Sequence, residues 1–510
     1  MSAATGFAPL AAPAQPFNKA PTQLSNATRL PTLGDTSRED LSPIVERKLG
    51  EEIMREIRRD RDYLDDDAIG EYLNNFGGAL VDAVPGARGE TNADFTFFPV
   101  RDSAINAFAL PGGFIGIHSG LLLAAQTESE LAGVVSHEIG HVSQRHIARM
   151  LGQQRQDALL PLASFILAAL AAKASPDAAM GVLMGGQGLA VQRQLNFSRD
   201  AEREADRVGF QIMGAGGYDT SGMVAFFKRL QSANKIYGEI PAFLSSHPLT
   251  SERIVDIQAR IKETPYRQRP DTIEFHLAKA RARVLQDQGT IGRRDTRTTF
   301  QAQLTQQHRQ QQVAAQYGLS FLALKEGDLA AARSWYDKAR AAMQPKAGVF
   351  SAAPGSDGGA MFAVLDLEIK LAPGQPKEVI QQALKDAEQA SHRYPLSRAL
   401  ARQYADAMIN AGKLDDATRY LRDQVQLYRE DAKLYDLLAR AYSNQGKIAL
   451  QHMALAESYV LAGALPAAVD QLNFARKASD VSFYEQSVID ARERELKARQ
   501  KEEKEEEKGK

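Results

Sequence analysis

The sequence predicts an α+β domain, mostly helical with a small antiparallel sheet, followed by an all-α array of helical repeats. Three observations support this prediction. Short runs rich in aromatic and β-branched residues lie between residues 95 and 118. The segments on either side of these runs have apolar residues at helical spacing. After about residue 265 the chain has helical periodicity without strand signals, and its glycines recur ahead of similar small and apolar residues.

The composition limits the class of protein. A chain of 510 residues is too long for one hydrophobic core and indicates two or three domains. Its 44% hydrophobic and 25% charged residues are ordinary for a globular protein, and its net charge of −1 argues against a nucleic-acid-binding protein. Because the chain contains no cysteine, disulfides, thiolate catalysis and cysteine-ligated zinc are all excluded.

Residues 1–40 are rich in Pro, Ala, Asn and Thr, which predicts a flexible N-terminal arm. The first residues, through Phe17, have neither a basic segment nor a long apolar run, so they do not form a signal peptide as they stand. The small residues at positions 11–15 are of the kind found near a cleavage site. We therefore expect a native signal peptide to be missing from this sequence.

Two helices and three strands are predicted next. Ser42 as N-cap and Pro43 as the first helical residue open a helix that runs to Arg61, and a second helix spans residues 68–84. Strands are expected at residues 95–100, 105–110 and 114–118, with residues 111–113 as a hairpin loop. An extended peptide is able to add to such an antiparallel strand, although a hairpin that only completes the core fits the pattern equally well.

Residues 137–141 read H-E-x-x-H, on a helix that the capping box Thr127–Glu130 opens. Positions i and i+4 share one face of a helix, so His137 and His141 present two imidazoles to one metal ion. Glu138 stands where its carboxylate is able to take a proton from a water molecule. The alternative, two surface histidines one turn apart, disagrees with the apolar residues that surround them in the sequence.

A second predicted helix carries acidic residues that fit the same ion. Glu202 and Asp206 are four residues apart and share a face. Ala201, Ala205 and Gly209 form an adjoining seam of small side chains, which lets another helix approach closely. This arrangement brings Glu202 to the metal and lets Asp206 accept the free N–H of a ligating histidine. The spacing alone leaves open the alternative of an exposed acidic first turn on an ordinary helix.

A long apolar insertion separates the two helices. The first helix is predicted to continue through Arg149, and His146 on it lies outside the i, i+4 pair and is interpreted as structural. The stretch from Leu159 to Ala172 is then almost wholly apolar, but it is too short for a membrane-spanning helix and Pro161 interrupts it. Two interpretations stay open: a buried helix, which the pattern favours, and a mobile flap or surface that contacts a membrane or an unfolded protein.

In this order, the two motifs resemble those of the HtpX-type, CAAX-prenyl-protease-like zinc metallopeptidases, as do the stretches at 106–113 and 120–122. The resemblance covers roughly residues 40–265 and implies a zincin-like metalloprotease domain at residues 41–264. It implies one Zn²⁺ per chain, bound by His137, His141 and Glu202, with Glu138 as the general base. It also implies that Asp206 supports a ligating histidine.

A later stretch, residues 246–254, matches an H-P-x-x-x-x-R-I pattern found in soluble members of this family. Two roles are open for His247: stabilising the oxyanion of the tetrahedral intermediate, or occupying the open position of the zinc ion in a resting state. The second role would make the enzyme latent. A histidine that only caps a loop is the alternative. Arg253 fits pairing with the oxyanion, with Asp206 or with Asp256.

The second half of the chain carries a repeated pattern. Gly327 and Gly463 are each followed at the same offsets by a small, an apolar and a small residue, and Gly412 begins a weaker copy. Gly412 and Gly446 lie 34 residues apart, which is the tetratricopeptide period. Residues 265–490 therefore resemble a tetratricopeptide-repeat array, and a non-repetitive helical bundle is the alternative. The tail, residues 491–510, is almost wholly charged and is expected to be a solvated helix or disordered.

A peptidase of this type joined to C-terminal repeats resembles the beta-barrel assembly-enhancing proteases of the Gram-negative periplasm. The resemblance implies a periplasmic zinc endopeptidase that degrades misfolded or stalled outer-membrane proteins. The repeats would bind these clients or the beta-barrel assembly machinery, and no nucleic-acid partner is expected. Two other functions stay open: a chaperone-like repeat scaffold whose peptidase site is plugged or inactive, and a zinc hydrolase that acts on a non-peptide bond.

Overall fold

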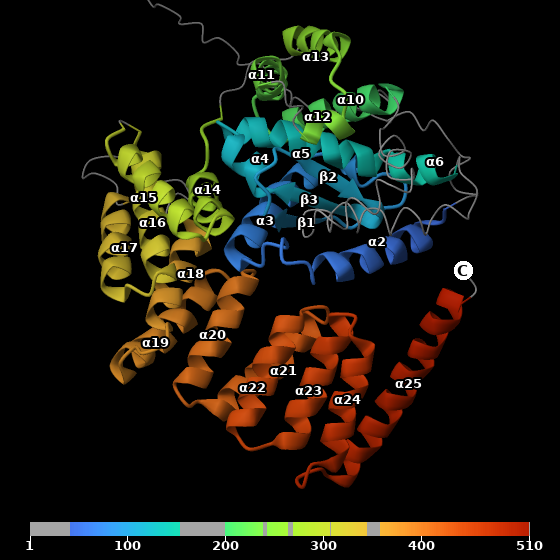
Figure 1. Ribbon diagram of the computed structural model, residues 1–510, viewed down its shortest axis with the longest axis vertical. Helices are drawn as coiled ribbons and strands as arrows, with labels where there is room; N and C mark the ends of the chain where they lie inside the picture. Colours follow the sequence, from blue (N-terminus) through green and yellow to red (C-terminus); the bar gives the residue numbers. More distant parts are fainter. Residues whose placement is uncertain are drawn as a thin grey trace, which may run out of the picture. The chain divides into compact units, whose positions relative to one another are not determined.

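The structure is a computed structural model that describes residues 41–152, 199–237, 242–263, 269–306, 308–343 and 358–508 (Figure 1). The predictions for the N-terminal arm, residues 1–40, and for the insertion Leu159–Ala172 lie outside these described residues. Helices dominate the described part of the chain, and one three-stranded sheet lies near its beginning. No helix in the described part is long and apolar enough to cross a membrane.

Two helices precede the sheet. In α2 (Pro43–Ile57), Ser42 is the N-cap and accepts a backbone hydrogen bond of 3.3 Å, with proline at the first helical position as predicted. α3 (Asp67–Asp82) is capped by Asp66, which accepts a backbone hydrogen bond of 3.0 Å. α2 ends before the predicted Arg61, and its apolar face packs against the sheet.

The sheet consists of β1 (Thr96–Val100), β2 (Ala107–Leu110) and β3 (Phe114–His118) in the order β1-β3-β2. β2 and β3 are antiparallel and are joined by a turn at Pro111–Gly113, as predicted. β1 pairs with β3 in parallel, so the expectation of a purely antiparallel sheet is wrong for this strand. The short turn fixes the pairing of β2 with β3, whereas no local feature sets the partner of β1. β3 is buried at every residue, and β2 lies at an edge.

The H-E-x-x-H motif lies on α5 (Glu128–Ser143), as predicted. Thr127 caps the helix and accepts a hydrogen bond from the N–H of Glu130 at 3.2 Å. The carboxylate of Glu130 accepts from the N–H of Gln126 at 2.6 Å, rather than from Thr127 as a capping box requires. Every residue of α5 is buried, because helices and strand β2 pack around it.

α5 ends before the predicted Arg149. Arg145 has a φ of 52°, a left-handed conformation, and a separate helix, α6 (His146–Gly152), begins at the next residue. The guanidinium of Arg145 is held by Glu46, at 2.9 and 3.1 Å, and by the carbonyl oxygen of Leu41 at 2.7 Å. These partners lie 99 and 104 residues earlier in the chain, so no local pattern predicts the break.

α10 (Arg199–Ala215) crosses α5 at close range, and glycines make the approach possible. A Cβ atom on Gly140 would lie 2.9 Å from the carbonyl oxygen of Ala205. A Cβ atom on Gly209 would lie 2.8 Å from the backbone nitrogen of His137. The predicted seam of small residues on α10 therefore faces α5, and it sets the distance between the two helices.

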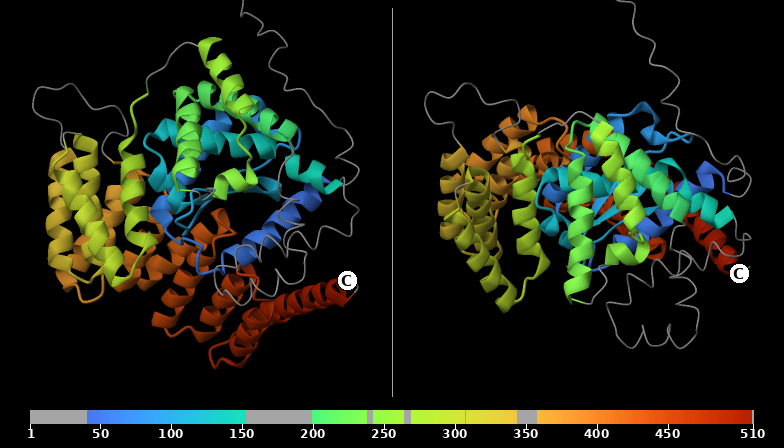
Figure 2. Two further views of the ribbon diagram at one scale, coloured as in Figure 1. Left: turned by 45° about the horizontal axis from the view of Figure 1, so that its top comes forward. Right: turned by 90° about the horizontal axis from the view of Figure 1, so that it is seen from above.

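The other described elements are also helical (Figure 2). They are, in chain order, the 3₁₀ turn η2 (Pro85–Arg88), α4 (Ser119–Ala124), α11 (Ser221–Tyr237), α12 (Ala242–Ser246), α13 (Ser251–Glu263), α14 (Ile273–Gln286), α15 (Thr290–Leu304), α16 (Arg309–Lys325), α17 (Leu329–Met343), α18 (Gly359–Lys370), α19 (Lys377–Arg393), α20 (Arg398–Asn410), α21 (Leu414–Leu427), α22 (Ala432–Asn444), α23 (Ile448–Leu461), α24 (Leu465–Lys477) and α25 (Phe483–Lys508).

Left-handed glycines separate pairs of helices in the second half. Gly327, Gly412, Gly446 and Gly463 have φ values of 81°, 76°, 72° and 70°, and each lies between two consecutive helices. Only glycine adopts this conformation at little cost, which explains why it recurs there. Many consecutive helices of this region pack against each other, and its described residues contain no strand, as predicted. The assignment to tetratricopeptide repeats stays a prediction.

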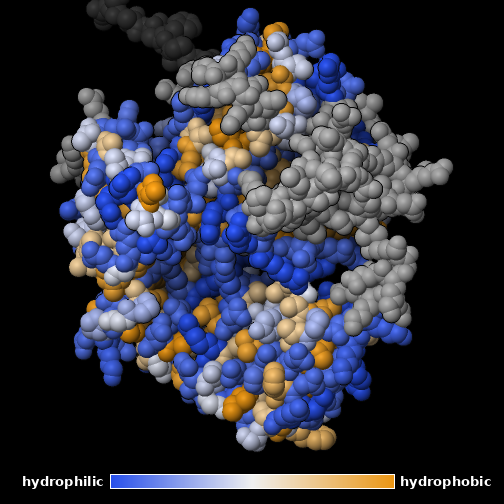
Figure 3. Space-filling view, in the orientation of Figure 1, coloured by the Kyte–Doolittle hydropathy of each residue, from blue (hydrophilic) through white to orange (hydrophobic). Residues whose placement is uncertain are grey.

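The predicted charged tail belongs to α25 through residue 508, and its described side chains are not all in contact with solvent. Ile489 and Leu496 of this helix are buried and pack against apolar residues of α24. Phe483 and Tyr484, at its beginning, are 90% and 77% exposed. On the face of the molecule drawn in Figure 3, hydrophilic residues surround smaller groups of apolar ones.

Candidate metal centre

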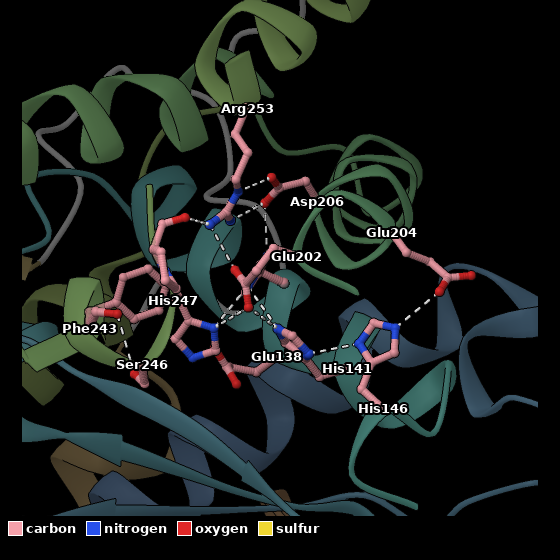
Figure 4. A network of polar contacts seen from close by, with 12 residues as sticks. Glu138, His141, His146, Glu202, Glu204, Asp206, Phe243, Ser246, His247 and Arg253 are labelled. Carbon is pink, nitrogen blue, oxygen red and sulfur yellow. Dashed lines mark hydrogen bonds and ion pairs between the residues drawn. The ribbon is translucent and has the colours of Figure 1, made fainter. Parts of the chain in front are cut away.

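Four residues predicted as part of the site converge in the interior (Figure 4). His137 and His141 come from one face of α5, Glu202 comes from the beginning of α10, and His247 directly follows α12. All four side chains are buried, and their ligand atoms lie within 4.8 Å of one another. The fold thus brings three separate segments to one point.

The spacing of the donor atoms fits a single metal ion. His137 Nε2 lies 3.0 Å from His141 Nε2, and the Glu202 carboxylate lies 3.5 Å from His137 Nε2 and 3.4 Å from His141 Nε2. Donors bound tetrahedrally to zinc at about 2.0–2.1 Å lie about 3.3 Å from one another. Two imidazole nitrogens and a carboxylate oxygen are also a common ligand set of catalytic zinc. The residues present therefore fit a zinc ion.

Asp206 and Arg253 contact the ligands from the side of α10 and α13. His137 Nδ1 lies 2.9 Å from Asp206 Oδ1, which is the contact expected for a ligating histidine. Arg253 contacts both oxygens of Asp206, at 2.6 and 2.8 Å, and its Nη1 lies 2.7 Å from Glu202 Oε2. Of the predicted partners of Arg253, Asp206 is in contact, whereas Asp256 pairs with another arginine.

The chain is similar to known proteins. Residues 81–261 match the family model described as peptidase family M48. The beta-barrel assembly-enhancing protease of Escherichia coli (strain K12) is 30% identical over 473 residues, which are 93% of this chain and 92% of that protein. The chain belongs to peptidase family M48. It is also similar to the putative beta-barrel assembly-enhancing protease of Vibrio cholerae serotype O1, with 36% identity over 252 residues, 49% of this chain and 51% of that protein.

Another relative of this M48 peptidase matches over a shorter part of the chain. The mitochondrial metalloendopeptidase OMA1 of Schizosaccharomyces pombe is 31% identical over 164 residues, 32% of this chain and 46% of that protein. The family makes the chain a metallopeptidase, and the buried cluster of His137, His141, Glu202 and His247 is its metal site.

Glu138 lies beside the metal site of this M48 peptidase. Its side chain is fully buried, and its Oε1 lies 3.4 Å from His247 Nε2. Burial raises the pKa of the Glu138 carboxyl group, while the charges of His247 and His137 oppose the rise. A carboxylate with a raised pKa is better suited to taking and returning a proton near neutral pH than an ordinary surface carboxylate.

The two histidines of α5 differ in their electrostatic surroundings. Burial lowers the pKa of His141 well below its usual 6.5. Burial acts the same way on His137, but hydrogen bonds with Asp206 and Glu202 outweigh it and raise the pKa of His137 to about 9. Burial alone would raise the pKa of Glu202, yet His247 and the two histidines of α5 hold it well below the usual range. Glu202 is therefore ionised and able to bind a cation.

His247 lies among the donor atoms rather than to one side of them. Its Nδ1 is 3.0 Å from Glu202 Oε1 and 3.4 Å from His137 Nε2. Phe243 of α12 stacks on the His247 ring, with 4.7 Å between the centroids, and donates its N–H to the carbonyl oxygen of Ile105 at 3.2 Å. Of the two roles open for His247, this geometry favours occupation of the open position on the metal.

Two residues lie next to the metal site although the sequence analysis gave neither a role there, and it interpreted His146 as structural. His146 Nδ1 lies 2.8 Å from His141 Nδ1, and His146 Nε2 lies 3.1 Å from Glu204 Oε2. Glu204 also pairs with Arg149 at 2.8 Å. On a straight helix, a residue five positions after His141 would point away from it, and only the break at Arg145 brings His146 back. A third histidine so close to H-E-x-x-H was the one signal available in the sequence.

Proposed function

We propose that this chain is a zinc-dependent endopeptidase in which His137, His141 and Glu202 hold one zinc ion and Glu138 is the general base. The observation that supports this most strongly is the convergence of the three donor groups at zinc-like spacing, next to a buried carboxylate. Membership of peptidase family M48 supports the same chemistry.

A bound zinc ion supplies Lewis acidity to the scissile carbonyl group and to the attacking water. Glu138 accepts the proton of that water and later returns it to the leaving amine, so that one carboxylate acts first as a base and then as an acid. Asp206 accepts the Nδ1–H of His137 and so keeps the other ring nitrogen free of a proton for the ion. Arg253 fixes both carboxylates, Asp206 and Glu202, in place.

The substrate binds as an added strand along β2. β2 is an edge strand of the sheet, and α5, which carries Glu138, packs beside it. An extended peptide that pairs with this edge gains main-chain hydrogen bonds, which do not depend on the identity of its side chains. Such binding suits an enzyme that acts on protein segments of varied sequence.

His247 holds the enzyme in a latent state until the segment around α12 moves. While His247 lies among the donors, it would hold the position on a bound ion that a peptide carbonyl group needs. The same segment is tied to Ile105, two residues before β2, through the N–H of Phe243. Movement of α12 would therefore free the metal and the beginning of the substrate strand together.

The proposed substrates are misfolded or stalled outer-membrane beta-barrel proteins in the periplasm. Relatives named beta-barrel assembly-enhancing protease align over 93% of this chain and 92% of their own length, so the similarity includes the helical second half. We assign that half to binding these clients or the beta-barrel assembly machinery. Stacked helical repeats offer a long surface that suits extended protein segments.

The position of His247 also favours a second candidate function. If His247 never leaves the donor cluster, the chain acts as a chaperone-like repeat scaffold with a plugged peptidase site. The intact Glu138 argues against this function, because a scaffold has no use for a buried general base.

One experiment separates these functions. An unfolded outer-membrane beta-barrel protein is incubated with wild type, Glu138→Gln and His247→Ala, and the zinc content of each protein is measured. We expect Glu138→Gln to cleave at least about 10²-fold more slowly with its zinc retained, because a carboxamide cannot accept the proton. His247→Ala should cleave faster than wild type.

Each other result has a defined meaning. Slower cleavage by His247→Ala would assign His247 to the oxyanion instead of to latency. Cleavage at the wild-type rate by Glu138→Gln would contradict the assignment of the general base. Wild type and His247→Ala that both contain zinc and are both inert would leave the scaffold as the function.

A further inference from the structure

We propose that His146 and Glu204 are positioning residues of the metal centre, and that they fix the proton and the orientation of His141 through a chain of hydrogen bonds. His141 Nε2 faces the donor cluster, 3.4 Å from Glu202 Oε1, while its Nδ1 lies 2.8 Å from His146 Nδ1. His146 Nε2 lies 3.1 Å from Glu204 Oε2. Figure 4 shows His141, His146 and Glu204 following one another away from the cluster.

Proton positions along this chain follow from the metal site alone. A nitrogen that binds a metal carries no proton, so His141 with Nε2 at the ion carries its proton on Nδ1. That N–H points at His146 Nδ1, which must then accept and be unprotonated. The proton of neutral His146 is therefore on Nε2, where it donates to the carboxylate of Glu204. Each of the two hydrogen bonds therefore has one donor and one acceptor. In both, the donor lies on the side of His141 and the acceptor on the side of Glu204.

The two histidines of α5 are thus supported in parallel ways. His137 reaches a carboxylate directly, because its Nδ1 lies 2.9 Å from Asp206, which Arg253 neutralises. On the other side, His141 reaches the carboxylate of Glu204 through an inserted imidazole, and Arg149 neutralises Glu204 at 2.8 Å. A carboxylate that accepts the outer N–H of a ligating histidine orients its ring and increases its basicity. The hydrogen bonds through His146 let Glu204 orient His141 and increase its basicity over a longer distance.

The break between α5 and α6 is what makes the chain possible. Arg145, in its left-handed conformation, turns the backbone so that His146 begins α6 beneath His141. Contacts with Glu46 and the carbonyl oxygen of Leu41 hold Arg145 in this turn. The His146 side chain is 1% exposed, so its two ring nitrogens depend on protein partners rather than on bulk water.

Zinc affinity of the full chain, measured by competition with a chelator, tests this proposal. The proposal rests on the proposed zinc site but does not depend on peptide hydrolysis. A protein that binds zinc but cleaves no peptide would contradict the proposed function and leave this inference unaffected. His146→Phe keeps a ring and removes both nitrogens, and we expect zinc affinity to fall about 10–100-fold. His146→Asn places a carbonyl oxygen near the position of Nδ1, and we expect it to recover much of the loss.

A matched control is His276→Phe. His276 lies on α14, is largely buried and has an aspartate, Asp271, at 3.6 Å, so its substitution also removes a carboxylate-paired histidine. We expect this variant to bind zinc like wild type. The absorption spectrum of the Co²⁺-loaded protein, which reports ligand geometry, should change in His146→Phe and stay unchanged in His276→Phe.

Glu204→Gln tests whether His146 acts through its hydrogen bond to Glu204 or only by packing against His141. In the wild-type background it should weaken zinc binding by about threefold or more, since the acceptor loses its charge. In the His146→Phe background, or in His146→Asn if the phenylalanine variant does not fold, it should have no further effect. Zinc affinities of His146→Phe and His146→Asn within twofold of wild type, or an equal effect of Glu204→Gln in both backgrounds, would overturn the proposal.

Discussion

Buried charges in this molecule are neutralised to different degrees. Arg253 contacts Asp206 and Glu202, so each of these two buried carboxylates has a cation beside it. Burial alone would raise the pKa of Asp206, but Arg253 and His137 lower it. Lys279 is different, because its ammonium group donates to the carbonyl oxygen of Ala125 and has no ion pair among the described residues. Burial therefore lowers the pKa of Lys279 to about 8.

Lys279→Met should stabilise the protein more at pH 7 than at pH 10. In the unfolded chain Lys279 titrates near 10.4, so between about pH 8 and pH 10.4 the unfolded state binds more protons and stability rises with pH. Below pH 8 the buried ammonium carries its full cost, which methionine removes. We expect the gain in unfolding free energy to be about 1–3 kcal/mol larger at pH 7. Urea unfolding measures it, with the exposed Lys228→Met as control, and equal gains at both pH values would contradict the prediction.

At the scale of single residues, the sequence predicts those whose positions follow from helical spacing. The spacing of His137 and His141 on one helix indicated that they could share an ion, the family resemblance added Glu202, and the structure brings the three together. His146 could not be predicted in the same way. Its position depends on the left-handed turn at Arg145, which a carboxylate from a distant helix stabilises.

The crossing of α5 and α10 positions the metal centre at the scale of elements. Gly209→Ala should separate these helices, because the new Cβ atom would meet the backbone of Ser136 and His137 at 2.8–2.9 Å. We expect the unfolding free energy to fall by about 1–3 kcal/mol and zinc affinity to fall with it, since α10 also carries Glu202. Urea unfolding and zinc titration measure the two effects.

Gly78→Ala is the matched control for this substitution. Gly78 lies inside α3, and a Cβ atom there would have no neighbour within 4 Å. Alanine favours a helix interior over glycine by about 0.5–1 kcal/mol, so this variant should be neutral or more stable. If Gly209→Ala is as stable as Gly78→Ala, close packing does not set the distance between α5 and α10.

Elements were predictable from the sequence where their signals are local. Ser42 with Pro43 and Thr127 marked helix beginnings correctly, and the turn at Pro111–Gly113 marked the antiparallel pair. The direction of β1 was not predictable, because its parallel pairing with β3 depends on which strand takes the central place in the sheet. Pairing between strands that no short turn connects is a property of the whole core.

At the scale of the molecule, an acidic run at the beginning of α3 meets basic residues of the helical second half. Asp66 contacts Arg281 of α14, whose guanidinium also pairs with Glu368 of α18. The neighbouring Asp65 and Asp67 contact Lys433 of α22. Contacts join the described residues between 41 and 508 into one compact unit. Because α3 also packs against β1 and α5, these ion pairs connect the second half to the helix that carries the metal ligands.

Arg281→Met should therefore lower the stability of the whole molecule rather than that of one helix. Arg281 is 2% exposed and lies 2.7 Å from Asp66, so its removal leaves the buried Asp66 and the partly exposed Glu368 without their cation. Breaking a buried ion pair in this way costs about 3–5 kcal/mol. We expect wild type to unfold in a single calorimetric transition. The variant should begin to unfold at a lower temperature and in two transitions, as the peptidase region and the second half separate.

Arg333→Met provides the comparison, because Arg333 of α17 also contacts two carboxylates, Asp337 and Asp366, but its side chain is 42% exposed. Water screens such pairs, so its loss should cost at most about 1 kcal/mol and leave one transition. If both arginine variants unfold like wild type, the acidic run of α3 does not couple the two halves. Movement of the second half would then have no direct route to α5 and the metal centre through these ion pairs.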